Sequence, residues 1–106
     1  MAAPNSGVFT GTAAALGTIT GTLGRSVVFK VVTSSTETVS VTGTIKGAAV
    51  SSQIMCYSLA TGALHSSVSM DDGTYYIPQI YTDDLIFLGS GASDTKTVTF
   101  LIGDRF

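Results

Sequence analysis

The chain has 106 residues, a length that fits one domain able to bury a core without disulfides or metals. Charged residues make up only 11% of it, with five Lys and Arg against seven Asp and Glu. Because this balance leaves no basic surface to neutralise a run of phosphates, we do not expect nucleic acid as a partner. Cys56 is the single cysteine, which excludes an internal disulfide. We expect its side chain to be buried in a strand as a small apolar group.

The first 24 residues differ from the rest of the chain. They carry no charge and repeat Gly-Thr among Ala, Leu and Ile, which divides the sequence into a low-complexity arm, 1–24, and a β-sandwich domain, 25–106. The apolar residues of the arm are too many for a segment that lives freely in water. Two interpretations stay open: the arm supplies irregular strands to the same core, or it orders against a neighbouring subunit.

After Arg25 the apolar residues alternate with a period of two, which is typical of half-buried strands. The pattern predicts seven short strands, at residues 27–32, 38–46, 54–59, 64–70, 75–77, 85–88 and 97–102. In the fourth of these strands, Leu64, Ser66, Val68 and Met70 are expected on one face and His65, Ser67 and Ser69 outward. Tyr75 is expected in the core with Tyr76 outward, and residues 47–49 as a connection. Seven such strands imply a two-layer antiparallel sandwich.

Several short motifs occur in the order and spacing of carboxypeptidase-regulatory-like domains. They are Gly43-Thr44-Ile45, the small residues from Gly47 to Val50, the strand and turn from Ile54 to Gly62, and Asp72-Gly73-Thr74-Tyr75. The chain resembles that family over roughly residues 39–80. The resemblance implies an all-β, seven-stranded antiparallel Ig/transthyretin-like β-sandwich, here with an extended N-terminal arm. It also implies a module that packs, spaces and docks and does not catalyse.

The residues that catalysis and cofactor binding need are scarce. His65 is the single histidine, and no other His or Cys lies at zinc-ligand spacing, so neither an enzyme nor a bound cofactor or metal is expected. Carboxylates cluster at Asp71-Asp72, Asp83-Asp84 and Asp94. A calcium site is an open alternative there, but the spacing is not that of an EF-hand loop and Asp-Gly is ordinary turn chemistry.

The composition favours a structural protein that binds its neighbours. A surface with little charge costs little to desolvate, and many weak contacts add up over a lattice. Short chains with arms rich in Gly and Thr resemble phage virion proteins, so we expect a capsid or tail component that contacts other virion proteins and copies of itself. The expected partner-binding residues are Val8, Phe9, Leu16, Ile19 and Leu23 as apolar anchors, with Arg25 and Arg105 as polar ones.

The alternative is a glycan-binding or adhesive module that uses Tyr76, Tyr81 and the Asp83-Asp84 loop. Neither interpretation involves a membrane or a small-molecule substrate. No signal peptide and no apolar run of about eighteen residues is visible, so we expect synthesis in the host cytoplasm and a final location in the virion.

Overall fold

The structure is a computed structural model that describes residues 6–50 and 54–103. The described residues form ten β-strands and no helix. The strands are β1 (Ser6–Gly11), β2 (Ala15–Thr20), β3 (Ser26–Thr33), β4 (Val39–Ile45), β5 (Ala48–Val50), β6 (Cys56–Ser58), β7 (Leu64–His65), β8 (Gly73–Ile77), β9 (Asp84–Gly89) and β10 (Lys96–Gly103). Within these ranges no helix is long and apolar enough to cross a membrane.

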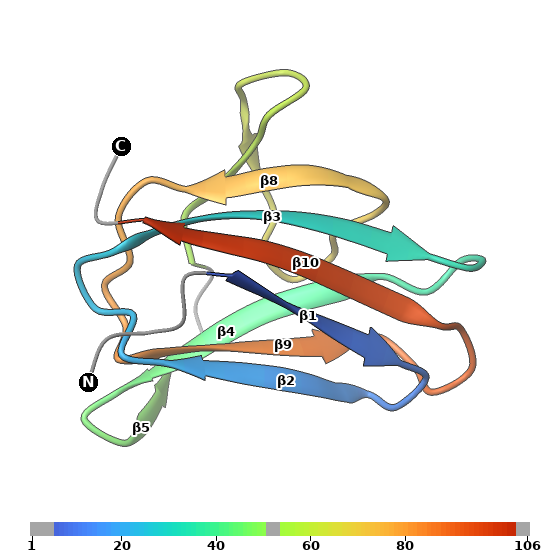
Figure 1. Cartoon of the computed structure of the whole chain (residues 1–106), viewed down its shortest axis with the longest axis horizontal. Coiled ribbons are helices and arrows are strands. Elements are labelled where there is room, and N and C mark those ends of the chain that lie inside the picture. Colours follow the sequence, from blue (N-terminus) through green and yellow to red (C-terminus); the bar gives the residue numbers. More distant parts are fainter. Residues whose placement is uncertain (1–5, 51–53, 104–106) are drawn as a thin grey trace.

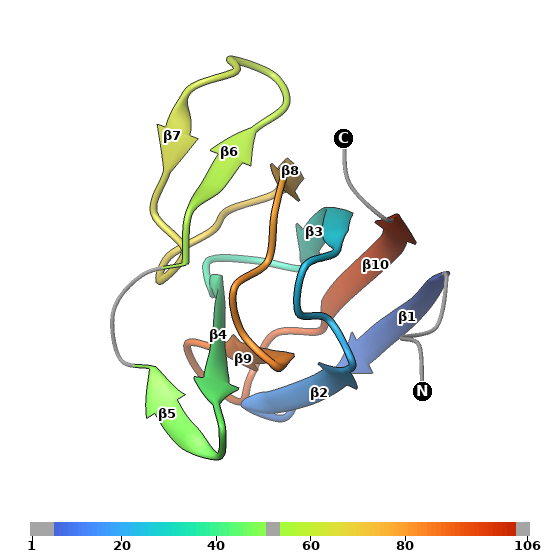
Figure 2. The same ribbon diagram turned by 90° about the vertical axis from the view of Figure 1, so that its left-hand side faces the viewer.

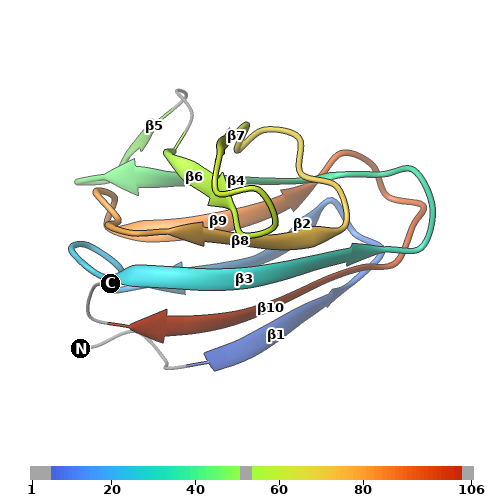
Figure 3. The same ribbon diagram turned by 90° about the horizontal axis from the view of Figure 1, so that it is seen from above.

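The strands form two antiparallel sheets that face each other (Figure 1). One sheet has six strands in the order β1-β10-β3-β8-β6-β7, and the other has four in the order β2-β9-β4-β5. Figure 2 shows both sheets nearly end-on, with β6 and β7 at the far end of the larger sheet from β1. In Figure 3, β1, β10, β3 and β8 lie side by side. The prediction of an all-β fold built from two antiparallel sheets is confirmed.

The core lies between the sheets because each strand turns alternate side chains inward. Aromatic rings connect the two layers: Phe87 of β9 lies 5.3 Å from Phe29 of β3 and 6.0 Å from Phe9 of β1, measured between ring centroids. Phe29 also packs on Tyr75, whose exposed fraction is 4%, while Tyr76 next to it is half-buried. The predicted inward and outward placement of these two tyrosines is therefore confirmed.

The expected number of strands is wrong, since the described residues form ten and not seven. The seven expected strands are present as β3, β4 and β6 to β10, and the additional ones are β1, β2 and β5. The stretch expected as a connection after Gly47 is strand β5, which pairs with β4. Lys46 and Gly47 join the two strands with φ angles of 50° and 83°. This left-handed pair is the geometry of a tight hairpin turn, and glycine adopts it readily.

The alternation expected across residues 64–70 is also wrong. Leu64, expected on the inward face, is 60% exposed, and His65, expected outward, is half-buried with its ring 4.9 Å from that of Tyr75, measured between centroids. Ser67 is fully buried, and its Oγ accepts a hydrogen bond from the backbone N–H of Ile54 at 3.0 Å, whereas Val68 is 53% exposed. Pairing with the buried Cys56 of β6 sets the inward face of His65. After His65, β7 ends and the main chain crosses to β4. There the N–H of Val41 donates to the carbonyl of Ser67 at 2.8 Å, and Met70 pairs with Val39. Once the pairing partner changes, a period-two pattern no longer predicts which side chains are buried.

The structure places half of the expected N-terminal arm, residues 6–11 and 15–20, in the two sheets. β1 pairs with β10 along its whole length, and β2 pairs with β9. The loop that follows is also fixed, because Thr22 is fully buried and its Oγ1 donates to the carbonyl of Thr82 at 3.1 Å. Of the two interpretations of the arm, this arrangement corresponds to strands within the same core.

Candidate interaction surface

The outer face of the six-stranded sheet carries a continuous line of apolar side chains. Strand register places Leu101 of β10 opposite Val28 of β3, and Val28 opposite Tyr76 of β8. Tyr57 of β6 lies opposite both Tyr76 and Leu64 of β7. We call these five residues the apolar row. Side chains that face each other directly across antiparallel strands lie within contact distance, so the row crosses five strands without a polar gap.

The centre of the apolar row holds a pair of stacked tyrosine rings beside a shallow hollow. The rings of Tyr57 and Tyr76 stack with centroids 5.4 Å apart and an angle of 23° between their planes. Beside them, Val28, Leu59, Gly62 and Tyr76 line a shallow hollow of about 290 Å³. Leu101, Leu64 and Leu59 are 61%, 60% and 50% exposed. Large apolar side chains gathered at this level of exposure are typical of a protein-binding surface.

The residues beside the apolar row are nearly free of charge. The next line across the sheet pairs Val8 with Thr99, Thr99 with Lys30, and Lys30 with Thr74. Of the residues on this face within the described strands, Lys30 alone carries a charge. Threonine hydroxyls and a single ammonium cost much less to remove from water than a surface rich in ion pairs. This face can therefore be buried against another protein at low cost.

The outer face of the four-stranded sheet is different. The central line there pairs Thr18 with Ile86 and Ile86 with Thr42, so the one apolar residue lies between two threonines. The next line ends in Asp84, whose Oδ1 accepts hydrogen bonds from the backbone N–H and the hydroxyl of Thr44 at 2.7 and 3.1 Å. The two outer faces thus differ in character, and the continuous apolar line belongs to the larger sheet.

The expected apolar anchors divide into two groups. Ile19 is 2% exposed, and Phe9 and Leu16 pack against the core, so in this arrangement their side chains serve the fold of their own chain. Val8 and Leu23 are 57% and 59% exposed and remain accessible to a partner. These two belong to the same stretch of sequence as the three that pack in the core, and the alternation of faces along β1 separates Val8 from Phe9.

Of the two expected polar anchors, Arg25 lies next to the end of β10. Arg25 Nε donates to the carbonyl of Gly103, the last residue of β10, at 3.4 Å. Arg105 lies outside the described residues. Arg25 therefore connects the start of β3 to the end of β10 within the chain.

The residues expected for glycan binding are not gathered in one place. Tyr76 belongs to the apolar row, whereas Tyr81, 67% exposed, lines a separate hollow of about 150 Å³ with Ile45 and Met55 among others. Neither of these two hollows is lined by both tyrosines. Asp83 Oδ2 accepts a hydrogen bond from the backbone N–H of Lys46 at 2.7 Å, so it holds the β4–β5 turn.

The side chains of Asp72 and Asp94 also bind backbone amides. Asp72 Oδ1 accepts from the N–H of Thr33 at 2.7 Å, and Asp94 Oδ2 accepts from the N–H of Glu37 at 2.8 Å. Within residues 6–50 and 54–103, no group of three or more His, Cys, Asp or Glu side chains is placed to hold a metal ion. The carboxylates act here as acceptors for turns and loops, the role that Asp commonly has in such positions.

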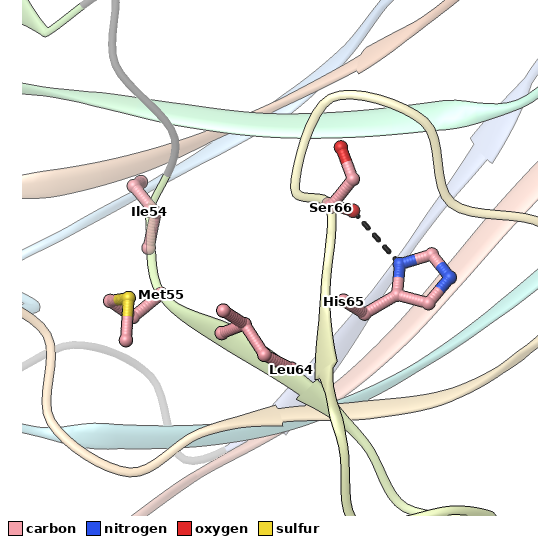
Figure 4. A pocket seen from close by; sticks show the side chains of 5 residues that line it. All are labelled: Ile54, Met55, Leu64, His65 and Ser66. Carbon is pink, nitrogen blue, oxygen red and sulfur yellow. Dashed lines mark hydrogen bonds between the residues drawn. The ribbon is translucent and has the colours of Figure 1, made fainter.

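Cys56 and His65 are cross-strand partners in β6 and β7, a pairing that the sequence did not reveal. The Cys56 thiol donates to the carbonyl of His65 at 3.5 Å, and burial raises the pKa of this thiol to about 11. The His65 ring is turned toward the carbonyl of Ser66, with Nδ1 2.9 Å from that oxygen, on the opposite side of β7 from Leu64 (Figure 4). A nucleophilic cysteine needs a lowered pKa, so this arrangement favours a structural cysteine.

Lys96 is a second residue that the sequence analysis did not single out. Its ammonium is fully buried and donates to Glu37 Oε1 at 2.7 Å and to the carbonyls of Thr12, Gly91 and Asp94 at 2.9 Å each. Lys96 lies two residues before the buried Val98 in β10, so the period-two pattern of this strand could have indicated its inward face. The cluster joins three loops at one end of the sandwich.

Comparison with known proteins gives one informative result. A scan against protein-family models and a search of curated proteins both found no match. Among solved structures, the crystal structure of the SPBc2 prophage-derived protein YomS matches with a TM-score of 0.69, covering 97% of each chain at 14% sequence identity. The two proteins therefore share an all-β fold along almost their full length.

Proposed function

We propose that this protein is a non-enzymatic structural component of a phage particle, a capsid decoration or tail-associated protein, that binds neighbouring subunits. The observation that carries the proposal is the apolar row, five side chains in register across the outer face of the six-stranded sheet. The shared fold with a prophage-derived protein supports the phage context. In this proposal the sandwich is of the transthyretin-like type, and the chain reaches the virion after synthesis in the host cytoplasm.

The partner's chemistry follows from the surface. A row of leucine, valine and tyrosine beside threonines is matched by another uncharged β-rich surface that presents an aliphatic or aromatic side chain to the hollow at Tyr76. Each contact of this kind is weak. Repetition across the identical subunits of a particle makes the summed binding strong without any new contact.

The test is incorporation into particles produced from the genome that encodes the chain. We expect the wild-type protein in purified particles, and we expect Leu101→Glu and Tyr76→Glu to remain folded but to be lost from them. Thr18→Glu is the matched control, because Thr18 is an exposed strand residue on the outer face of the smaller sheet. Absence of the wild-type protein from particles would exclude the structural role, and normal incorporation of Leu101→Glu would exclude this surface.

A glycan-binding module is the second candidate, favoured by the stacked Tyr57 and Tyr76 beside an accessible hollow. Tyrosine rings are common platforms for sugar rings because they offer an apolar face with a polar edge. A glycan array with the isolated protein, repeated with Tyr76→Leu, separates the two candidates. Saturable glycan binding that Tyr76→Leu abolishes would favour the glycan-binding module. The absence of binding to any glycan on the array would favour the structural role.

A further inference from the structure

We infer that β1 is the site at which a second copy of this chain adds to the six-stranded sheet, strand against strand, through an antiparallel pair of β1 strands. This inference deepens the part of the proposed function that concerns self-association. It concerns the edge of the sheet, whereas the proposed docking of other virion proteins concerns its face.

The two sheets have four edge strands, and three of them are poor templates for pairing. β7 has two residues and β5 has three. The pairing of β2 with β9 is irregular between Ala15 and Gly17. Short strands and irregular register are common ways in which proteins protect a sheet edge from unwanted pairing.

β1 has none of these protections. It is six residues long and pairs with β10 in unbroken register from Ser6 opposite Leu101 to Gly11 opposite Lys96. The sequence Ser-Gly-Val-Phe-Thr-Gly contains no charged residue and no proline. No described strand pairs with its outer side (Figure 3). A regular uncharged edge strand leaves a row of main-chain donors and acceptors open to another strand.

β1 is also held in the extended shape that pairing requires. On its inner side, the Phe9 ring lies 5.3 Å from that of Phe100 and 6.0 Å from that of Phe87, measured between centroids. On the outer face of the sheet, the hydroxyls of Thr10 and of Thr97 in β10 are 2.9 Å apart and hydrogen-bonded. A strand fixed in this way loses little further conformational entropy when a partner binds, which lowers the cost of association.

A second copy fits this edge because the strand is compatible with itself. Two β1 strands related by a two-fold axis bring like residues together, so a charged strand would repel its own copy. Side chains that face outward in one strand must also lie opposite outward-facing side chains of the other, and a shift of the register by one residue would pair outward with inward positions. A register centred on Val8 meets both conditions: it sets Val8 opposite the partner's Val8 and Ser6 opposite the partner's Thr10. The outer faces of the two six-stranded sheets, each with its apolar row, then form one continuous surface.

The experiment measures dimerisation of the full chain by sedimentation equilibrium. We expect the wild-type protein to dimerise and Val8→Glu to raise the dissociation constant by about tenfold or more, because the new carboxylates face each other across the axis. Val8 is 57% exposed, so the variant should fold. Ser6→Glu, at another exposed position of the same strand, is the second variant if Val8→Glu does not fold.

Thr99→Glu is the matched control, because Thr99 is exposed and lies directly opposite Val8 but one strand in from the edge. We expect it to leave dimerisation unchanged. A mixture of Val8→Glu and Val8→Lys should dimerise more tightly than either variant alone. The inference is overturned if the wild-type chain stays monomeric at millimolar concentration, if Val8→Glu dimerises normally, or if Thr99→Glu weakens the dimer equally. Any of these results leaves incorporation through the apolar row unaffected.

Discussion

Replacing Lys96 with methionine removes a buried ammonium while keeping an unbranched apolar stem of similar length. In the native structure this ammonium donates to the carbonyls of Thr12, Gly91 and Asp94, and to the carboxylate of Glu37. Thr12 lies between β1 and β2, and the other two carbonyls lie between β9 and β10. The substitution therefore leaves backbone acceptors of two different loops without their donor.

The expected loss follows from the number of carbonyls. Each hydrogen bond contributes about 1 kcal/mol net, so three lost bonds lower the free energy of unfolding by about 3 kcal/mol. Domains of this size have a total stability of about 5–15 kcal/mol, which makes the loss large. At about 4–8 °C per kcal/mol, the melting temperature should fall by about 12–24 °C. Hydrogen exchange should speed up most in the loops that Lys96 joins.

The assay is urea and thermal unfolding followed by circular dichroism and tyrosine fluorescence, since the chain contains four Tyr and no Trp. Lys30→Met is the matched control, because Lys30 is exposed on the outer face of β3 and its replacement should change stability by no more than about 0.5 kcal/mol. If Lys96→Met and Lys30→Met are equally stable, the buried ammonium does not hold the loops together as described.

Three further predictions test other parts of the fold. Gly43→Ala should destabilise the protein by about 1–3 kcal/mol in urea unfolding, because a Cβ at this position would collide with the backbone carbonyl of Asp84; wild-type stability would refute this. Cys56 should react with a thiol reagent only as the protein unfolds, since burial raises its pKa to about 11, and rapid reaction in native buffer would contradict that. The hydrogen bond from Lys96 holds the pKa of Glu37 below 4.5, although burial acts in the opposite direction. The stability that ionised Glu37 contributes should therefore be complete above pH 4.5 and be lost as the pH falls through the lowered pKa. Unfolding curves of the wild type and Glu37→Gln should therefore converge in acid, and a difference that stays constant below pH 4.5 would argue against this linkage.

The structure also changes the expected effect of truncation. From the sequence, deleting residues 2–24 should leave a folded sandwich that no longer enters particles. The deleted segment contains both β1 and β2, together with the buried Ile19 and Thr22. We now expect the truncated chain to be strongly destabilised, since Phe87 and Phe100 would lose the ring of Phe9 that covers them. Point substitutions in the apolar row are therefore the cleaner test of function.

Sequence by itself determined the all-β class, the approximate positions of seven of the eight described strands after Arg25, and the inward and outward placement of Tyr75 and Tyr76. These depend on a period of two within one strand, which is a local property of the chain. The same rule applied to β10 places Lys96 inward beside Val98, although the sequence analysis did not draw that inference.

The tertiary structure alone decided which strands are neighbours, and the candidate surface depends on that. Val28, Tyr57, Tyr76 and Leu101 are up to 73 residues apart in the chain, and each taken alone is an ordinary outward residue of a strand. They form one row because the register of β10, β3, β8 and β6 aligns them. Register between distant strands is fixed by packing of the whole core and by turn geometry, neither of which is visible in a local pattern.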